Sequence, residues 1–427
     1  MGMRLGALKE AEMQRLLAHF EQRLEEILER LASCSADEEG VTRLLYTPEW
    51  LSGQQTVKEI MEQAGLEASF DEVGNLFGKL KGATERGSIM TGSHIDTVVN
   101  GGKYDGAYGI AAGIVALGYL KDQYGMPLRA LEVVSLCEEE GSRFPMAYWG
   151  SGAITGERSF SQTAELTDKE GIFFAEAMAD CGFGEGSGLS AKRRDIDAFI
   201  ELHIEQGIVL ESERKQVGIV NAIVGQRRFQ VEVAGEANHA GTTPMDMRKD
   251  ALEGAAAIIS RLRHEAIALG PPLVATAGTI RISPNAPNVV PGYAVFTVDI
   301  RHADRTALES FCARFHEAAS SLAGERGLGY RCREWFREDP VPMDKELSEK
   351  LMNICEDLKI EVKEMSSGAG HDAQMLARLC PSAMLFVPSR GGVSHSPQEY
   401  TSPRELAIGV LALTALLYQL GYEEERR

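Results

Sequence analysis

The sequence has few cysteines for its length, and they form no recognisable pattern. Its 427 residues include seven cysteines, and no two of them stand in a Cys-x-x-Cys pair. An odd number of scattered thiols argues against a disulfide framework. We therefore expect reduced, structural thiols in a cytoplasmic protein.

Basic residues are outnumbered by acidic ones. The chain has 44 Lys and Arg residues against 63 Asp and Glu residues, which gives a net charge of −19. This balance argues against nucleic acid or an anionic membrane as a partner. The same charge would repel an anionic substrate, so such a substrate would need local Arg or His groups to receive it.

The chain also lacks a long uninterrupted apolar run. The longest, Leu406 to Tyr418, is too short to span a bilayer, and we expect it to form a buried C-terminal helix. Lys9, Glu10 and Glu12 interrupt any apolar run near the first residue, so we expect no signal peptide. The sequence shows neither an internal repeat nor the glycine pattern of a phosphate-binding loop.

What is present is typical of a globular protein with an α/β sheet. Hydrophobic residues make up 44% and charged residues 25% of a chain long enough for two or more folding units. Helical spacing and strand-like runs alternate, with a glycine-rich loop between the second and third strands. The expected helices cover 8–31 and 56–64, and the expected strands cover 75–80, 88–92 and 131–136.

The spacing of apolar residues changes after residue 222. Apolar residues alternate with polar ones over 228–233, and we expect a separate α+β unit, inserted over 223–331, in a first unit that comprises 1–222 plus 332–427. The inserted unit is expected to contain helices over 249–268 and 307–324 and strands over 274–282 and 293–300. The first unit then resumes with a helix over 345–358, a strand over 383–387 and a last helix.

A set of imidazoles and carboxylates near strand ends suggests a metal site. The candidate ligands are His94, Asp105, Glu140, His203 and His395. They include no thiolate, which suits Zn²⁺, Mn²⁺ or Co²⁺ in a catalytic site with an open position. Five ligands serve two ions if one carboxylate bridges, and Asp105 in its glycine-rich loop is the best bridge.

Two further carboxylates have expected roles beside the ligands. Glu139 adjoins Glu140 and could act as general base on a water, while Asp96 could orient the ring of His94. The alternative is that the run of three glutamates is a solvated face and the histidines are structural, as we expect for His19, His264, His302 and His316. His371, in SGAGHDAQ, is as consistent with a functional role as with a loop-stabilising one.

The order of motifs resembles the M20-type metal-dependent amidohydrolases. The motifs are GSHIDTV, EEEGSRF, ELHIEQG, NHAGTTPM, NVVPG, VDIR, SGAGHDAQ and SHSP. The similar subgroup contains N-carbamoyl-L-amino-acid hydrolases, β-ureidopropionase and allantoate amidohydrolase. The resemblance runs from Val41 to the last helix. It implies an α/β, two-metal aminopeptidase-like catalytic domain with an inserted, smaller α+β domain of ferredoxin-like fold that serves as dimerisation domain and lid.

The resemblance also implies a role for each site residue. One ion would be held by His94, Asp105 and His203, and the other by Asp105, Glu140 and His395. Glu139 would be the base and Asp96 would hold the ring of the ligand His94, while His239 would reach the active site of the partner in a homodimer. The implied substrate contacts are Arg301 and Asn288 for a carboxylate, with Gln206, Gln226 and the backbone at Gly370.

Sequence segments that flank these motifs favour the members of the subgroup that hydrolyse allantoate. They include TRLLYTPEWL, FDEVGNLFGKL and VNAIVGQRR. The expected reaction is hydrolysis of one ureido group of allantoate to ureidoglycine, ammonia and carbon dioxide in purine degradation. The alternative keeps the same machinery for an N-carbamoyl-L-amino acid or β-ureidopropionate. A non-catalytic binding protein would be expected to lack the base or a ligand, and a peptidase would not need the carboxylate-binding set.

Overall fold

The computed structural model describes residues 10–424, and the chain forms two compact units. The first contains Met1–Asn221, Met343–Met365 and His371–Arg427, and the second contains Ala222–Pro342 and Ser366–Gly370. The second unit thus ends later than the 331 expected from the sequence. The reason is β12 (Gly329–Glu338), which pairs with β7 (Gly225–Ala234) and completes the sheet of the second unit.

The first unit is built around a mixed sheet. Its strand order is β1-β2-β4-β3-β5-β15-β6-β13, and β14 also pairs with β6. The strands are β1 (Glu67–Phe70), β2 (Leu76–Leu80), β3 (Ser88–His94), β4 (Leu131–Leu136), β5 (Ile196–Ile204), β6 (Val217–Ile223), β13 (Val341–Pro342), β14 (Val362–Ser367) and β15 (Ser382–Val387). The central strands β4, β3, β5 and β15 run parallel. Every residue of β3, β4 and β15 is buried, as in a sheet covered on both faces.

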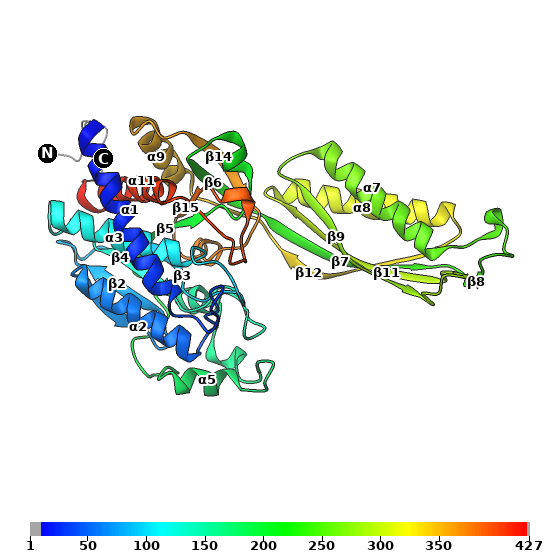
Figure 1. Ribbon diagram of the computed structural model, residues 1–427, viewed down its shortest axis with the longest axis horizontal. Coiled ribbons are helices and arrows are strands. Elements are labelled where there is room, and N and C mark those ends of the chain that lie inside the picture. Colours follow the sequence, from blue (N-terminus) through cyan, green and yellow to red (C-terminus); the bar gives the residue numbers. More distant parts are fainter. Residues whose placement is uncertain (1–9, 425–427) are drawn as a thin grey trace. The chain divides into compact units, whose positions relative to one another are not determined.

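Three long helices pack together in this unit. They are α1 (Glu10–Ala32), α3 (Ala107–Tyr124) and α11 (Pro403–Tyr422), which contact one another (Figure 1). Two of them, α3 and α11, also contact the sheet. The remaining helices of this unit are α2 (Pro48–Gln63), α4 (Trp149–Thr155), α5 (Phe174–Asp180), α6 (Val209–Glu213), α9 (Lys345–Asp357) and α10 (Ala373–Leu376). The sequence prediction started α2 at 56, which is too late. Thr47 caps its N-terminus by accepting the N–H of Trp50, and Pro48 suits the first turn.

The last helix is longer than its apolar run. It begins at Pro403, where Ser402 and Glu405 form a capping box, and it continues to Tyr422. By length and composition alone, this helix of 20 residues, with a mean hydropathy of 1.4 over an 18-residue window, could cross a membrane, whereas the predicted apolar run from Leu406 to Tyr418 is shorter than that window. Of its most apolar window, 78% is buried inside the protein, which agrees with the expected core helix.

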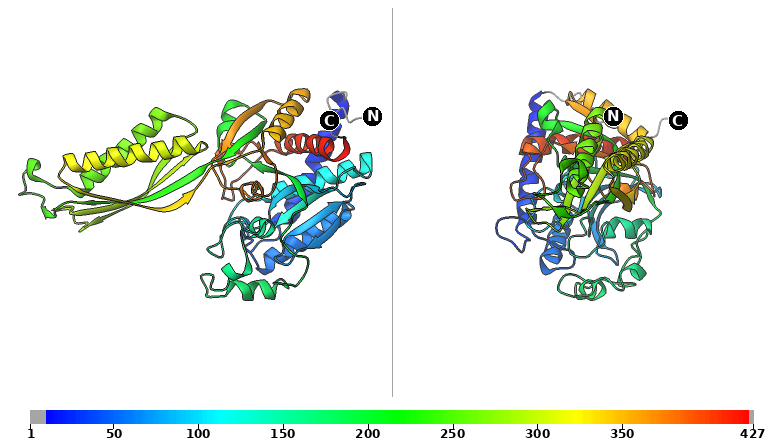
Figure 2. Two further views of the ribbon diagram at one scale, coloured as in Figure 1. Left: turned by 180° about the vertical axis from the view of Figure 1, so that it is seen from behind. Right: turned by 90° about the vertical axis from the view of Figure 1, so that its right-hand side faces the viewer.

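The second unit has a ferredoxin-like fold. Its elements follow one another as β7, α7 (Ala251–Leu269), β9 (Val274–Ser283), β11 (Tyr293–His302), α8 (Arg305–Glu325) and β12. The strands form an antiparallel sheet in the order β12-β7-β11-β9, with both helices on one face (Figure 2). Alternate side chains of β7 and β11 are buried beneath these helices, in a core that includes Phe229, Phe296 and Phe311.

Candidate metal centre

Parallel pairing brings the predicted ligands to one edge of the first sheet. His94 is the last residue of β3, and His203 is the last but one of β5. The glutamates Glu138–Glu140 follow β4 after a single residue, Cys137. Because carboxyl ends of neighbouring parallel strands meet at the same edge, segments far apart in sequence converge there. Asp105 reaches this edge from the loop before α3, and His395 from the loop after β15.

Asp105 lies at the centre of the cluster. Its Oδ1 is 3.5 Å from Nε2 of His94 and 3.2 Å from Nε2 of His203, and its Oδ2 is 3.2 Å from Nε2 of His395. Nε2 of His395 is also 3.5 Å from Oε1 of Glu140. His94, Asp105 and His203 therefore form one ligand group and Asp105, Glu140 and His395 another, each with ligand atoms within 4.8 Å of one another.

The second nitrogen of each buried ring faces an oxygen atom. Nδ1 of His94 is 3.0 Å from the carbonyl oxygen of Asp96 and 3.3 Å from its carboxylate, while Nδ1 of His203 is 2.9 Å from the carbonyl oxygen of Ile204. These contacts hold the rings so that Nε2 points toward Asp105. Imidazole and carboxylate donors in this arrangement fit two divalent cations that share Asp105.

Local backbone geometry explains the glycine after Asp105. Gly106 has a φ of 63°, and a Cβ there would lie 2.4 Å from the carbonyl oxygen of His94 and 2.6 Å from its ring. Only glycine allows this approach. Gln206 and His395 also have positive φ angles, of 57° and 53°. Non-glycine residues in this region often mark functional sites, where surrounding contacts hold them in place.

The three glutamates do not form a solvated face. Glu138 is buried, and its carboxylate accepts the N–H of Trp149 at 3.0 Å, which is a structural role. Asp96 accepts the N–H of Glu139 at 2.9 Å and that of Glu140 at 3.2 Å. Asp96 therefore holds both His94 and the turn that carries the two following glutamates.

The charges of the cluster shift one another's pKa values. Burial raises the pKa of Glu139 well above its usual range and that of Glu140 to about 7. The hydrogen bond to Asp105 raises the pKa of His395 to about 9. Burial would raise the pKa of Asp105, but hydrogen bonds from His203, His395 and His94 hold it well below its usual range. Crowded carboxylates of this kind are stabilised by cations.

Two predicted site residues, the catalytic His239 and the substrate-binding Asn288, lie on a short ribbon of the second unit. His239 belongs to β8 (Asn238–His239), which pairs with β10 (Val289–Val290), and the N–H of Ala240 donates to the carbonyl oxygen of Asn288 at 3.0 Å. His239 and Asn288 are both exposed. Nδ1 of His239 accepts the N–H of Gly241 at 3.0 Å, which leaves the proton on Nε2 for donation to a ligand.

Arg301 and Gln226 lie at the other end of the same sheet. They pair directly across β11 and β7, whereas Tyr293 pairs with Ala234 near the ribbon. Eight positions of β11 separate Tyr293 from Arg301, which corresponds to roughly 26 Å of strand. Asp299 engages Nε of Arg301 at 2.9 Å, and Nη1 of Arg301 donates to the carbonyl oxygen of Gly368 at 2.8 Å.

Gln206 lies beside the candidate ligands. Its Nε2 donates to Oδ2 of Asp105 at 2.8 Å, and its Oε1 is buried with no hydrogen-bond partner among the residues that the structure describes. Gly370 is half-buried at the end of the short segment Ser366–Gly370. The ring of His371 is buried, with its centroid 4.8 Å from that of His203, so its place is directly behind the ligand cluster.

Sequence reasoning missed two residues of this region, Glu399 and Ser394. Both contact the Asp105 loop. Glu399 stands four positions after His395 in SHSPQEY, and that proximity was the available signal.

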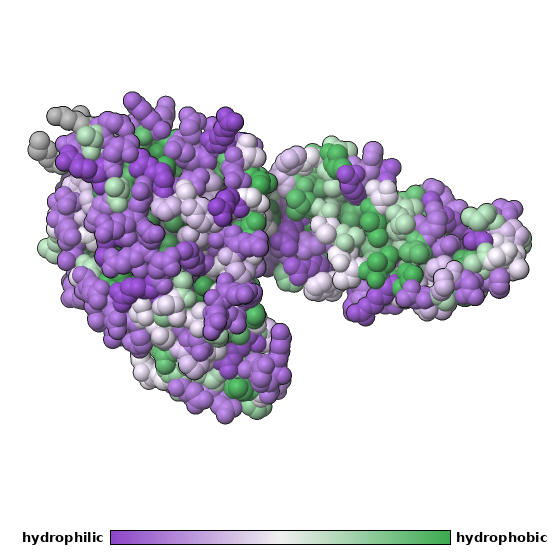
Figure 3. Space-filling view, in the orientation of Figure 1, coloured by the Kyte–Doolittle hydropathy of each residue, from purple (hydrophilic) through white to green (hydrophobic). Residues whose placement is uncertain are grey.

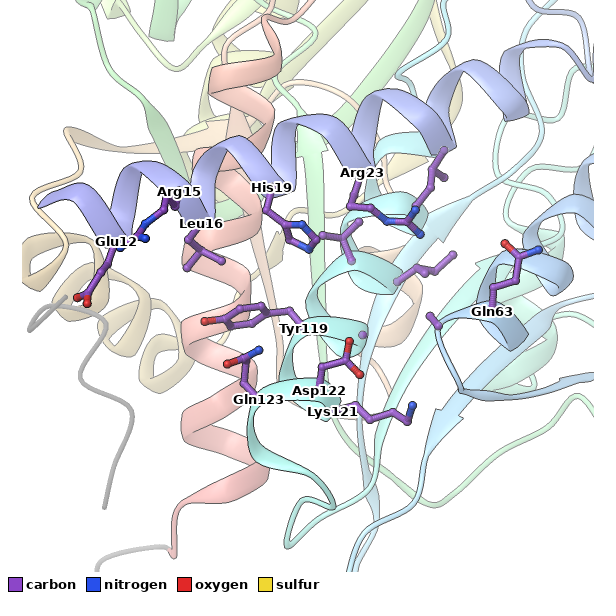
Figure 4. Close-up of a pocket in the computed structure, with 15 residues that line it drawn as sticks. Glu12, Arg15, Leu16, His19, Arg23, Gln63, Tyr119, Lys121, Asp122 and Gln123 are labelled. Atoms are coloured by element: carbon purple, nitrogen blue, oxygen red, sulfur yellow. The ribbon is translucent and has the colours of Figure 1, made fainter. Parts of the chain in front are cut away.

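A surface pocket of about 620 Å³ lies away from the candidate ligands (Figure 4). It is bounded by α1, the end of α2 and α3, and its polar lining includes His19, Tyr119 and Lys121. None of the predicted site residues lines it. The pocket therefore does not locate the active site.

Comparison with known proteins agrees with this geometry. Residues 90–419 match the family described as peptidase family M20/M25/M40. The chain is 51% identical to the allantoate amidohydrolase of Bacillus subtilis (92% of this chain, 96% of the relative) and 47% identical to that of Escherichia coli (96% and 100%). It is 35% identical to an N-carbamoyl-L-amino-acid amidohydrolase of Paenarthrobacter aurescens (91% and 95%). An amidase of the hydantoinase/carbamoylase family from Burkholderia multivorans has a similar structure, with a TM-score of 0.90, 32% identity and coverage of 94% and 98%.

Proposed function

The chain belongs to peptidase family M20/M25/M40, and we propose that it hydrolyses allantoate to ureidoglycine, ammonia and carbon dioxide in purine degradation. It is a hydrolase of C–N bonds, as its relatives are. The similarity to two allantoate amidohydrolases over more than nine-tenths of the chain carries the choice of substrate. The seven free cysteines fit a cytoplasmic location.

The first unit supplies the metal ligands. One divalent ion would be held by His94, Asp105 and His203 and the other by Asp105, Glu140 and His395, with manganese, zinc or cobalt as the metal. Such ions, when bound, polarise a carbonyl group and lower the pKa of water. A ureido carbonyl is a poor electrophile, so this polarisation is needed. The ligand groups that share Asp105 support the assignment.

Glu139 moves the proton. Its carboxylate takes a proton from the attacking water and returns it to the leaving nitrogen. Burial raises the pKa of Glu139 well above its usual range, which makes its ionised carboxylate a stronger proton acceptor. The hydrogen bond from the N–H of Glu139 to Asp96 fixes the backbone at this position.

Polar groups of both units bind the substrate. The guanidinium of Arg301 binds the carboxylate of allantoate through its planar fork of donors. Asn288, Gln206, Gln226 and the backbone at Gly370 form hydrogen bonds with the remaining polar groups. Nε2 of His239 donates to the oxyanion that forms at the attacked carbon. The buried, unpartnered Oε1 of Gln206 supports a donor group of the substrate beside it.

Two copies of the chain form the working enzyme. His239 and Arg301 lie at opposite ends of one sheet, so a single second unit does not bring them to one substrate. We infer that His239 acts in the active site of the partner and that the second unit is the dimerisation domain and lid. One of its two edge strands, β9, exposes Val274 and Ile280, and the preceding end of α7 exposes Ile267. Hydrophobic side chains are visible on this unit's surface in Figure 3.

The second candidate substrate is an N-carbamoyl-L-amino acid. The 35% identity to an N-carbamoyl-L-amino-acid amidohydrolase supports it. In that case a side chain would replace the second ureido group of allantoate. A site that hydrogen-bonds that ureido group would reject an apolar side chain strongly, because its polar groups would lose their partners.

An ammonia-release assay distinguishes these substrates. The Mn²⁺-loaded enzyme would be given allantoate, N-carbamoyl-L-methionine, N-carbamoyl-β-alanine or a dipeptide. Ammonia release measures cleavage of the three ureido compounds, and chromatography of the released amino acids measures cleavage of the dipeptide, which yields no ammonia. We expect the highest kcat/KM for allantoate. A higher value for either carbamoyl compound would overturn the substrate assignment, and preference for the dipeptide would restore the peptidase alternative.

A further inference from the structure

Glu399 is a buried carboxylate that belongs to none of the candidate ligand groups. Its exposed fraction is 5%. Its Oε1 accepts the backbone N–H of Tyr104 at 3.0 Å and that of Asp105 at 3.1 Å. Glu399 thus binds the loop that carries the proposed bridging ligand, although 294 residues separate it from Asp105.

The other oxygen of Glu399 reaches the segment that carries His395. Its Oε2 accepts the hydroxyl of Ser394 at 2.9 Å, and the same hydroxyl oxygen lies 3.1 Å from Oδ2 of Asp105. The N–H of Glu399 donates to the carbonyl oxygen of Ser396, which closes the turn after His395. One carboxylate therefore connects two loops that have no strand or helix to hold them together.

The loop before Asp105 is shaped to fit against this carboxylate. A Cβ on Gly102 would lie 2.2 Å from Oε1 of Glu399. Any side chain at this position would push the loop away from Glu399. The glycine therefore allows the close approach that brings two backbone N–H groups within hydrogen-bonding distance of one oxygen.

We propose that Glu399 is a positioning residue, whose carboxylate sets the spacing between Asp105 and His395. The inference rests on the proposed dinuclear centre, in which these two side chains bind the same ion. Glu399 itself stays out of the ligand sphere because N–H and O–H donors occupy its oxygens. A carboxylate is required because both oxygens act as acceptors, whereas an amide offers one acceptor and one donor.

Metal binding by the variant Glu399→Gln tests the role. The amide keeps the size of the side chain but cannot accept hydrogen bonds on both sides. We expect wild-type protein to bind two Mn²⁺ ions per chain. In Glu399→Gln, the ion held by Asp105, Glu140 and His395 should bind about 10–100-fold more weakly, the usual loss when a group behind metal ligands is removed. Titration calorimetry measures both affinities, and the spin-coupled electron paramagnetic resonance signal of the Mn²⁺ pair should weaken.

Asp71→Asn is the matched control. Asp71 is also buried, at 2% exposed, and it accepts the N–H groups of Val73 and Asn75 at 3.0 and 2.9 Å, before β2. It belongs to none of the candidate ligand groups. This variant should lose stability like Glu399→Gln, measured as a lower Tm of the metal-free protein, yet bind both ions with wild-type affinity. Equal loss of metal affinity in the two variants would overturn the positioning role.

Ser394→Ala provides a second test that does not alter the buried carboxylate. It removes only the hydroxyl between Glu399 and Asp105, and we expect a smaller loss of affinity at the same ion. If Glu399→Gln lacks the native circular dichroism spectrum, the metal affinity of Ser394→Ala tests the positioning role of Glu399 in its place. Wild-type affinity for both ions in either natively folded variant overturns the proposal. A wild-type protein that binds no pair of ions would overturn the dinuclear centre itself, before any variant is compared.

Discussion

The candidate residues of the two units differ in how completely one chain arranges them. In the first unit, His94 and His203 are 2% and 1% exposed, and hydrogen bonds hold them around Asp105. In the second unit, His239 and Asn288 are exposed on a ribbon at one end of a sheet, and Arg301 is at the other end. One copy therefore preorganises the candidate metal ligands, whereas the sheet of one second unit keeps His239 and Arg301 apart.

The largest expected effect comes from Asp105→Ala in the first unit. This change removes the carboxylate that both ligand groups share, so we expect loss of both ions and no measurable turnover. Metal content by elemental analysis and ammonia release check it. His395→Ala should instead weaken one ion. Two ions retained in folded Asp105→Ala would show that the ligands do not depend on a shared carboxylate.

Glu139→Gln should separate the base from the ligands. The amide keeps the shape of the side chain but cannot accept the proton, so kcat should fall about 10²–10⁴-fold. Both ions should stay bound, as elemental analysis would show. Glu140→Gln is the control, because it should lower metal occupancy. A near-normal kcat for Glu139→Gln would place the base elsewhere.

His239→Ala probes the second unit. Loss of one oxyanion donor should lower kcat about 10²–10³-fold while metal content stays intact. The comparison between units becomes sharper in mixed dimers of His239→Ala and Glu139→Gln chains. If His239 acts in the partner, one site of each mixed dimer carries both changes and the other carries neither, so about half of the wild-type activity per dimer should return.

The expected activity refers to each mixed dimer. The mixed dimers must therefore be purified from the two parent homodimers, which are both defective. Two affinity tags, one on each chain, would isolate them and establish that they have formed. Inactive mixed dimers would mean that His239 serves its own chain. The second unit would then assemble its part of the site without a partner, and the contrast between the units would disappear.

The smallest expected effect for a single step, here one pH unit, is the pH dependence of metal affinity in the first unit. In the metal-free protein the pKa of His395 is about 9 and that of Glu140 about 7. Both groups must lose a proton to bind a metal, so affinity should rise with pH between 6 and 8. The expected slope is roughly tenfold per pH unit for each displaced proton. Calorimetry in buffers of different ionisation enthalpy measures the proton release, and a pH-independent affinity would contradict the assignment.

Some elements were predictable because their sequence signals are local. The strand over 131–136 agrees with β4, and the helices predicted over 249–268 and 307–324 agree with α7 and α8 within a few residues. The prediction over 8–31 agrees with α1 from Glu10 onward, and residues 8 and 9 lie outside the described residues. By contrast, β6, β12 and β14 were missed. Side chains of β12 and β14 are largely exposed or half-buried, so their sequences show little apolar alternation.

The sequence by itself determined which chemical groups are available. His94, Asp105, Glu140, His203 and His395 were identified as a set from their types, motifs and positions near strand ends. Only the tertiary structure decided which of them meet, because parallel pairing of β3, β4 and β5 brings together segments more than a hundred residues apart. It also decided that Glu399 holds the Asp105 loop, since its partners there are backbone N–H groups, which any sequence provides. The separation of His239 from Arg301 follows from the antiparallel register of β7 and β11, which is a property of the folded sheet.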